Sequence, residues 1–254
     1  RYDPGEGAGA PLTLRFTAPM ASQLTVAEMF GPTFQGEGPS LGRRCVFLRL
    51  GGCNLRCRWC DTAYTWDWTG VTGTKYDPRQ ELRPVEVEDA WADLHARGTD
   101  MLVVSGGEPL LQQRDQRLLL ERAREAHYHI EVETAGTITP APDFLRLVDQ
   151  FNVSPKLDNS GNSLEERRRP AAIEALQASG KATWKFVAVN RAEVEEIAEM
   201  VGRHRLAPVY VMPEGIDPDT VLRRSRELAS AVLNRGWSLT TRLHILLHGN
   251  RRGV

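Results

Sequence analysis

Three cysteines stand close together in the run GGCNLRCRWCDT, which covers residues 51–62. Cys53, Cys57 and Cys60 leave three residues between the first pair and two between the second. Thiolates on short loops hold iron-sulfur clusters, and most electron-transfer clusters take four of them. Three close ligands leave one iron of a [4Fe-4S] cluster open, and the amino and carboxylate groups of S-adenosylmethionine can chelate an open iron. The spacing therefore predicts reductive cleavage of S-adenosylmethionine to a 5′-deoxyadenosyl radical.

Other uses of these thiols fit the sequence less well. A structural zinc site takes four ligands, usually from two cysteine knuckles, and the chain has no second knuckle. The one remaining cysteine, Cys45, lies in the apolar run CVFLRL, where a small buried thiol is the ordinary expectation. A role for Cys45 as a fourth cluster ligand is the alternative. Four cysteines with three of them crowded together do not resemble a secreted disulfide framework, which indicates a reducing compartment.

Composition excludes several classes of partner. The chain has 254 residues and a formal net charge of −1, without a long basic stretch, so electrostatics does not indicate a nucleic-acid surface. No apolar stretch approaches the roughly 18 residues of a membrane span, and the first residues lack the apolar core of a signal peptide. We therefore expect a cytoplasmic protein with no membrane partner. Residues 1–22 are expected to form a flexible lead-in, and residues 23–254 a single domain.

Short apolar runs alternate with amphipathic stretches along the chain. The runs predict buried strands at 45–50, 101–105, 130–134, 151–154, 183–189, 208–212 and 243–247. The stretches predict helices within 85–98, 110–127, 191–204 and 218–236. This alternation is typical of parallel βα units, and about six repeats precede the last strand. We therefore predict an α/β fold, a partial and open (β/α)6 barrel, with its active site at the carboxyl ends of the strands.

Several candidate binding residues fall at those strand ends. Arg49, near the end of the first predicted strand, could bind a substrate carboxylate through two hydrogen bonds, with a surface ion pair on an edge strand as the alternative. Ser105 to Pro109 form a Ser-Gly-Gly-Glu-Pro turn, in which the glycines allow close backbone approach and Glu108 could accept from an ammonium group. Two further turns could line the ribose and adenine of S-adenosylmethionine: Ser154-Pro155-Lys156 and Met212-Pro213-Glu214-Gly215.

Together these motifs resemble those of the radical S-adenosylmethionine enzymes, and more narrowly the 7-carboxy-7-deazaguanine synthase family. The specific marks are Glu28-Met29-Phe30, the block Gln35-Gly36-Glu37-Gly38, and Phe47-Leu48-Arg49 before the cysteines. The terminal run from Arg242 to His248 is also similar, although the residues around His248 depart from the family pattern. The resemblance extends from about residue 24 to the C-terminus and implies a barrel of the radical S-adenosylmethionine type.

The resemblance implies conversion of 6-carboxy-5,6,7,8-tetrahydropterin to 7-carboxy-7-deazaguanine with loss of ammonia, with S-adenosylmethionine acting as a catalytic cofactor. It also implies a homodimer, a reductant protein such as flavodoxin or ferredoxin, and Mg²⁺ held by Thr62. A plain helix cap is the alternative role for Asp61 or Thr62. The residues expected to border S-adenosylmethionine are Trp59, Asp61, Gly107, Glu108, Ser154, Pro155, Lys156, Met212, Pro213, Glu214 and Gly215. Those expected to contact the pterin are Phe34, Gln35, Gly36, Arg49, Ser105, His248 and, if the chain ends naturally there, Val254.

Two other functions share some of these features. An activase that makes a glycyl radical on a partner protein has the cysteine spacing but is not expected to carry the Gln35 to Gly38 block or Thr62. A non-catalytic iron-sulfur electron carrier normally supplies a fourth thiolate and needs no Gly-Gly-Glu-Pro turn. In a carrier, substitution of Cys45 should destroy the cluster.

Overall fold

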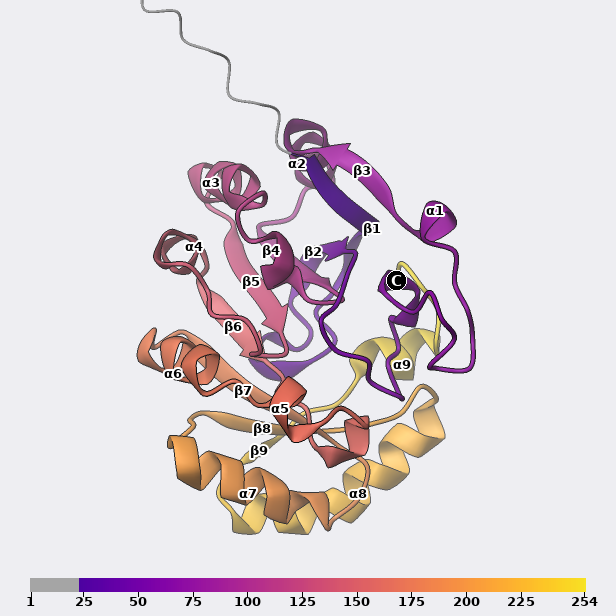
Figure 1. Cartoon of the computed structure of the whole chain (residues 1–254), viewed down its shortest axis with the longest axis vertical. Coiled ribbons are helices and arrows are strands. Elements are labelled where there is room, and N and C mark those ends of the chain that lie inside the picture. The colour runs from indigo at the N-terminus through magenta and orange to yellow at the C-terminus, as the bar shows by residue number, and fades with distance from the viewer. Residues whose placement is uncertain (1–22) are drawn as a thin grey trace, which may run out of the picture.

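A single curved sheet organises residues 23–254, the part of the chain that this computed structural model describes (Figure 1). Nine strands pair in the order β3-β1-β2-β4-β5-β6-β7-β8-β9. Strand β1 is antiparallel to both β2 and β3, and every pair from β2 to β9 is parallel. The strands are β1 Gln23–Phe34, β2 Arg44–Leu50, β3 Arg83–Glu86, β4 Met101–Gly106, β5 His129–Thr134, β6 Gln150–Val153, β7 Ala182–Ala188, β8 Val209–Pro213 and β9 Ser238–Leu239.

Helices cover the convex face of this sheet, as Figure 1 shows for α2, α3, α4, α6, α7 and α8. Each of the six follows one of the parallel strands from β2 to β8, so the chain builds six βα units, and the sheet does not close. This confirms the predicted partial (β/α)6 barrel. The helices are α1 Pro78–Glu81, α2 Val87–Ala96, α3 Arg117–Glu125, α4 Pro142–Leu147, α5 Leu164–Arg167, α6 Pro170–Ala178, α7 Glu193–His204, α8 Pro218–Asn234 and α9 Leu243–His248.

Burial of apolar side chains between the two layers stabilises this arrangement. Apolar strand residues pack under the helices, while the concave face also carries polar side chains, among them Ser105, Asn152 and Lys185. In β7 all seven residues are buried, and Trp184 and Phe186 lie in the main core with Val104 of β4 and Phe151 of β6. Within residues 23–254, no helix is both long and apolar enough to cross a membrane.

Several elements differ from the sequence predictions. Strands β3 and β9 and the helices α1, α4, α5 and α6 were not assigned from the sequence. The run 243–247, predicted as a strand, forms helix α9, because a short apolar run without clear alternation fits either structure and here only Ile245 is fully buried on one face. Strand β1 was not predicted as a strand, since its burial does not alternate regularly and its pairing with β2 shifts register between Phe30 and Thr33. The predicted lead-in at residues 1–22 lies outside the described residues.

Candidate active site

The concave side of the barrel opens into one large cavity at the carboxyl ends of the parallel strands. Its volume is about 1500 Å³, the open mouth included. The loop after β2, the ends of β4 to β8, helix α9 and the residues that follow α9 all contribute side chains. Figure 1 shows the loop after β2 and the yellow C-terminal segment together on this concave side.

The three motif cysteines lie in the loop after β2, and all three line the cavity. Each sulfur has a hydrogen-bond donor nearby: the Leu55 amide at 3.4 Å from Cys53, Asn162 Nδ2 at 3.2 Å from Cys57, and Trp66 Nε1 at 3.2 Å from Cys60. Hydrogen bonds to cluster sulfurs are one way in which proteins set the reduction potential of a cluster.

These thiols fit an iron-sulfur cluster better than a single metal ion. Burial raises the pKa of Cys53 to about 12 and also raises the pKa of Cys57 and Cys60, so coordination to iron is what would hold them as thiolates. Among residues 23–254, no three His, Cys, Asp or Glu side chains converge on a site for one ion. Thiolates around a cubane stand farther apart than ligands of one ion, which agrees with this arrangement.

Cys45 lies elsewhere, in β2. Its side chain is fully buried in a small apolar cluster with Phe30, Phe47, Met101 and Val103, and it is absent from the residues that line the cavity. The structure therefore gives Cys45 a packing role, and the alternative of a fourth ligand has no geometric support.

The Gly-Gly-Glu-Pro turn packs directly against the cysteine loop. The amide of Glu108 donates to the Gly52 carbonyl at 2.8 Å, and the amide of Gly107 donates to the Leu50 carbonyl at 3.1 Å. A Cβ built on Gly107 would lie 2.1 Å from that same Gly52 oxygen. Only glycine at this position allows the two backbones to approach so closely.

We expect Gly107→Ala to destabilise the protein by about 3 kcal/mol, because the atoms it would meet are backbone atoms that cannot rotate away. Cluster incorporation should fall as well, since the cysteine loop would have to shift. Gly202→Ala in α7 is the matched control, because a Cβ there meets nothing within 4 Å and alanine favours a helix. Urea unfolding of the two cluster-free variants measures the difference; equal stabilities would contradict the packing argument.

The Glu108 side chain has a different environment from the one predicted. Its carboxylate is fully buried and accepts hydrogen bonds from Thr134 Oγ1, the Ala135 amide and the Leu110 amide. Burial raises the pKa of Glu108, and its side chain is not part of the cavity wall. These hydrogen bonds tie the turn to the end of β5. The predicted role of Glu108 as the acceptor for an ammonium group stays a prediction.

Most of the residues predicted to border S-adenosylmethionine come together in the cavity. Lys156 Nζ lies 5.7 Å from the centre of the Trp59 ring and donates to the Ser154 hydroxyl at 3.0 Å. Pro155, Pro213 and Gly215 do not line the cavity, although their neighbours do. Those that line it are Trp59, Asp61, Gly107, Ser154, Lys156, Met212 and Glu214.

The residues predicted to contact the pterin also line the cavity, except His248. They are Phe34, Gln35, Gly36, Arg49, Ser105 and Val254. The His248 side chain is exposed at the end of α9, outside the cavity, whereas His244, one turn earlier, lines the wall. Residues four apart share a face of a helix, so it is the place of His248 at the end of α9, one turn farther along, that separates the two histidines.

Arg49 is partly buried, with 16% of its side chain exposed, and its Nε donates to Glu28 at 3.1 Å. Strand β2 lies between β1 and β4, so the alternative of an edge strand is wrong. The terminal nitrogens of Arg49 have no partner among the described residues, and they remain accessible. They can therefore bind an incoming carboxylate bidentately.

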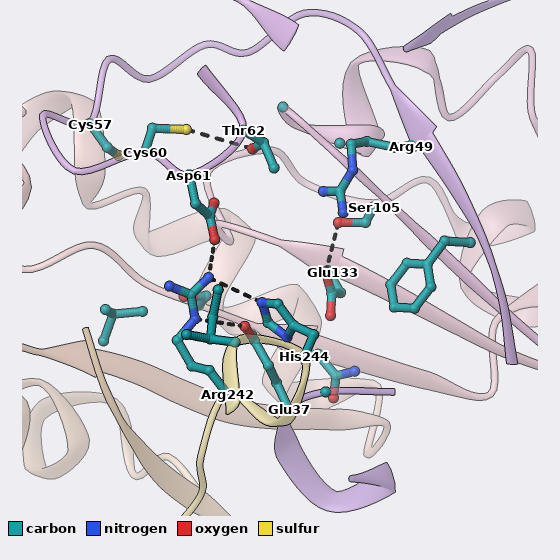
Figure 2. A pocket seen from close by; sticks show the side chains of 18 of the residues that line it. Glu37, Arg49, Cys57, Cys60, Asp61, Thr62, Ser105, Glu133, Arg242 and His244 are labelled. Carbon is teal, nitrogen blue, oxygen red and sulfur yellow. Dashed lines mark hydrogen bonds and ion pairs between the residues drawn. The ribbon is translucent and has the colours of Figure 1, made fainter. Parts of the chain in front are cut away.

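Five charged or titratable side chains that sequence reasoning did not combine form a network on the cavity wall: Glu37, Asp61, Lys185, Arg242 and His244. Figure 2 shows how Glu37, Asp61, Arg242 and His244 meet. Arg242 pairs with Asp61 and, through Nε at 3.3 Å, with Glu37, which also pairs with Lys185. Burial alone would raise the pKa of Glu37, but the charges of Lys185 and Arg242 outweigh it and hold that pKa well below its usual range. Arg242 likewise lowers the pKa of Asp61 against the effect of burial.

The position of His244 explains why residue 36, in the block Gln35 to Gly38, is a glycine. A Cβ on Gly36 would lie 2.3 Å from His244 Nδ1, so the imidazole packs directly on the Gly36 backbone. Arg242 lies 3.5 Å from His244 Nε2 and can only donate to it, which fits a neutral ring. Burial lowers the pKa of His244, with the Arg242 charge acting in the same direction. The histidine is thus held neutral beside the residues expected to face the pterin.

Thr62 lines the cavity two residues after the last cysteine. It precedes a short 3-10 turn at Ala63–Thr65, but its side chain makes no cap hydrogen bond there. Its hydroxyl lies 3.6 Å from Cys60 Sγ, and the Asp61 carboxylate is engaged by Arg242. The cap alternative therefore fails for Thr62, whose hydroxyl lies at the cavity wall beside Cys60.

Comparison with known proteins agrees with this site. The family model described as the Radical SAM superfamily matches residues 48–201. The 7-carboxy-7-deazaguanine synthase of Pyrobaculum aerophilum is 36% identical, with 91% of this chain and 97% of that protein aligned. The synthase of Bacillus subtilis is 30% identical, with 92% of this chain and all of that protein aligned.

A solved structure supports the fold independently. The crystal structure of QueE from Escherichia coli has a TM-score of 0.65, 24% identity, and covers 87% of this chain and 95% of its own. The chain is a member of the radical S-adenosylmethionine superfamily. Within that superfamily, it belongs to the 7-carboxy-7-deazaguanine synthase family.

Proposed function

We propose that this chain converts 6-carboxy-5,6,7,8-tetrahydropterin to 7-carboxy-7-deazaguanine with release of ammonia, a step of 7-deazapurine and queuosine biosynthesis. The observation that carries the proposal is that one cavity contains the three cluster thiols together with Arg49 and the Gln35-Gly36 backbone. The cluster thiols are needed to generate a radical. Arg49 and the Gln35-Gly36 backbone suit a heterocycle that carries a carboxylate. Relatives of similar length bear the name of this synthase.

The chain's own residues would divide the work between cofactor and substrate. Cys53, Cys57 and Cys60 would hold a [4Fe-4S] cluster, which together with S-adenosylmethionine would supply a 5′-deoxyadenosyl radical for abstraction of hydrogen from C6 of the pterin. Arg49 binds the pterin carboxylate, and the backbone at Gln35 and Gly36 faces the ring. The Gln35 side chain holds this segment in place by donating to Glu131 and Glu133. These contacts fix which carbon faces the radical source.

We further propose a site for Mg²⁺ at Thr62. Mg²⁺ is a hard ion that keeps several waters and accepts few protein ligands, so one hydroxyl plus substrate oxygens satisfies it. Thr62 supports this assignment because its hydroxyl lines the cavity and makes no helix-cap hydrogen bond. We also propose a cytoplasmic location, because the cluster needs a reducing compartment. The family resemblance further suggests a homodimer, and a small reductant protein such as flavodoxin or ferredoxin as the electron donor.

Arg49→Gln is expected to raise the KM for the carboxylated pterin about a hundredfold, since a bidentate charge-assisted pair is lost. The matched comparison is a tetrahydropterin without the carboxylate, which should bind both enzymes about equally. Steady-state kinetics and equilibrium binding of the two pterins to both enzymes measure the effect. An Arg49→Gln enzyme that still prefers the carboxylated pterin as strongly as wild type would contradict this role.

The function is tested anaerobically with reconstituted enzyme, dithionite, S-adenosylmethionine, Mg²⁺ and the pterin. We expect ammonia and 7-carboxy-7-deazaguanine in equal amounts by mass spectrometry. Formation of 5′-deoxyadenosine without any change in the pterin would reject the substrate and favour the glycyl-radical activase. A verified cluster without cleavage of S-adenosylmethionine would favour the electron carrier.

A further inference from the structure

The segment after α9 has no regular structure, and yet it forms part of the cavity wall. Residues 250–254 all line the cavity, and Figure 1 shows this yellow segment ending beside the loop that follows β2. Within the described chain, the ion pair and the ring contacts of residues 249–254 are all made by one side chain, Arg252.

The contacts of Arg252 form a small binding site, which we call the tail latch and define as Arg252, Tyr64, Tyr76 and Glu81. The Arg252 guanidinium carbon lies 3.6 Å from the centre of the Tyr64 ring and 5.6 Å from that of Tyr76. Its Nη1 lies 2.9 Å from Glu81. A planar guanidinium stacks on aromatic faces and pairs with a carboxylate at the same time.

Tyr64 and Tyr76, the two rings of the tail latch that Arg252 contacts, are held in place by neighbouring residues. Tyr64 and Tyr76 meet edge to face, with ring centres 6.3 Å apart. The Tyr76 amide donates to the Asp67 carbonyl at 3.0 Å, and the Asp67 carboxylate accepts from the amides of Gly70, Val71 and Thr72. The loop between the two tyrosines is therefore braced by Asp67.

The latch also reaches the proposed substrate arginine. The Tyr64 hydroxyl donates to Glu28 at 2.8 Å, and the same carboxylate oxygen accepts from Arg49 Nε. The Tyr64 ring thus contacts Arg252, while the Tyr64 hydroxyl hydrogen-bonds to Glu28, the carboxylate that orients Arg49.

We propose that Arg252 is a positioning residue that latches residues 250–254 against Tyr64 and Tyr76, so that the tail completes the pterin side of the cavity. This inference rests on the proposed function in assigning the pterin to that side. With the latch broken, the tail swings into solvent and the cavity binds the pterin more weakly. The chemistry at the cysteine loop does not require the latch.

The test uses variants that break the latch while leaving the tail sequence unchanged: Glu81→Gln and Tyr76→Leu. Glu227→Gln is the matched control, because Glu227 also pairs with an exposed arginine, Arg223 in α8. Trypsin cleavage after Arg251 or Arg252 in the cluster-loaded enzyme is followed by intact mass. Proteolysis of a transiently opened segment tracks the population of the open form.

We expect tail release about fivefold faster in each latch variant, the effect of losing one modest contact, and no change in the control. In the same variants, the KM for the pterin should rise about fivefold while kcat stays within about twofold. Unchanged tail release in both latch variants would overturn the latch. Faster release with an unchanged KM would overturn its positioning role. If the wild-type enzyme does not convert the pterin, the proposed function is wrong. The rate of trypsin cleavage in the latch variants still tests the latch in that case.

Discussion

Cys57→Ala is expected to abolish both the cluster and all cleavage of S-adenosylmethionine. Cys57 is buried beside the cavity, and with only three thiols in the loop no spare ligand can replace it. Anaerobic reconstitution should yield about four irons per chain in wild type and far fewer in the variant. The loss of 5′-deoxyadenosine formation should be at least about a thousandfold, because no other group supplies the electron.

Cys45→Ala is the matched control for this experiment. It removes a buried thiol from the cluster of Phe30, Phe47, Met101 and Val103, which should cost about 1 kcal/mol of stability and leave the iron content unchanged. Iron and sulfide counting on both variants gives the answer. A Cys45→Ala protein without a cluster, or a Cys57→Ala protein with a full one, would contradict the assignment of three ligands.

Arg242→Met is expected to reduce the free energy of unfolding by about 2 kcal/mol, because the buried Glu37 keeps only Lys185 as an ion-pair partner and Asp61 loses its ion pair. Only 5% of the Arg242 side chain is exposed, and 13% of that of Glu37. Asp61 should contribute less, since 36% of its side chain is exposed and solvent screens it. Activity should also fall, because Arg242 connects the Gln35 to Gly38 block with the residue after Cys60.

The pH dependence of the Arg242→Met effect provides a check of its cause. The pKa of Glu37 and that of Asp61 are lowered from their ordinary values of 4.5 and 3.8, so their contribution to stability is complete above about pH 5 and is lost as the pH falls through the lower folded values. The difference between wild type and variant should therefore shrink in acid. Urea unfolding of cluster-free protein measures it, with Arg203→Met as control, since Arg203 lies in an exposed helix pair worth about 0.5 kcal/mol. Equal losses in the two variants would contradict the argument.

Apolar periodicity predicted the parallel part of the fold well. The runs at 101–105, 183–189 and 208–212 become β4, β7 and β8 with shifts of one residue at most at each end. They are buried on both faces, and such strands are nearly continuous apolar runs. The first strand was missed because of its register shifts, and α9 was mistaken for a strand because six residues are too few to show a period.

The cluster loop could be found from spacing alone, but the charge network could not. Glu37, Asp61 and Arg242 are separated by up to 205 positions in the chain, and only the fold brings them together. Lys185 did carry a signal, because a lysine inside the otherwise apolar run TWKFVAV is costly unless it has a partner. His244 carried none, since residues four apart share a face in a helix and in a strand, and only the fold shows which of His244 and His248 reaches the cavity.

The most direct test of the account is the fate of the hydrogen at C6 of the pterin. With substrate deuterated at that carbon, we expect reconstituted wild-type enzyme to form 7-carboxy-7-deazaguanine and to transfer deuterium to S-adenosylmethionine, because the cofactor is regenerated in each turnover. That result would place C6 in contact with the radical source within this cavity. Product formed while S-adenosylmethionine and 5′-deoxyadenosine both carry no deuterium would contradict the account.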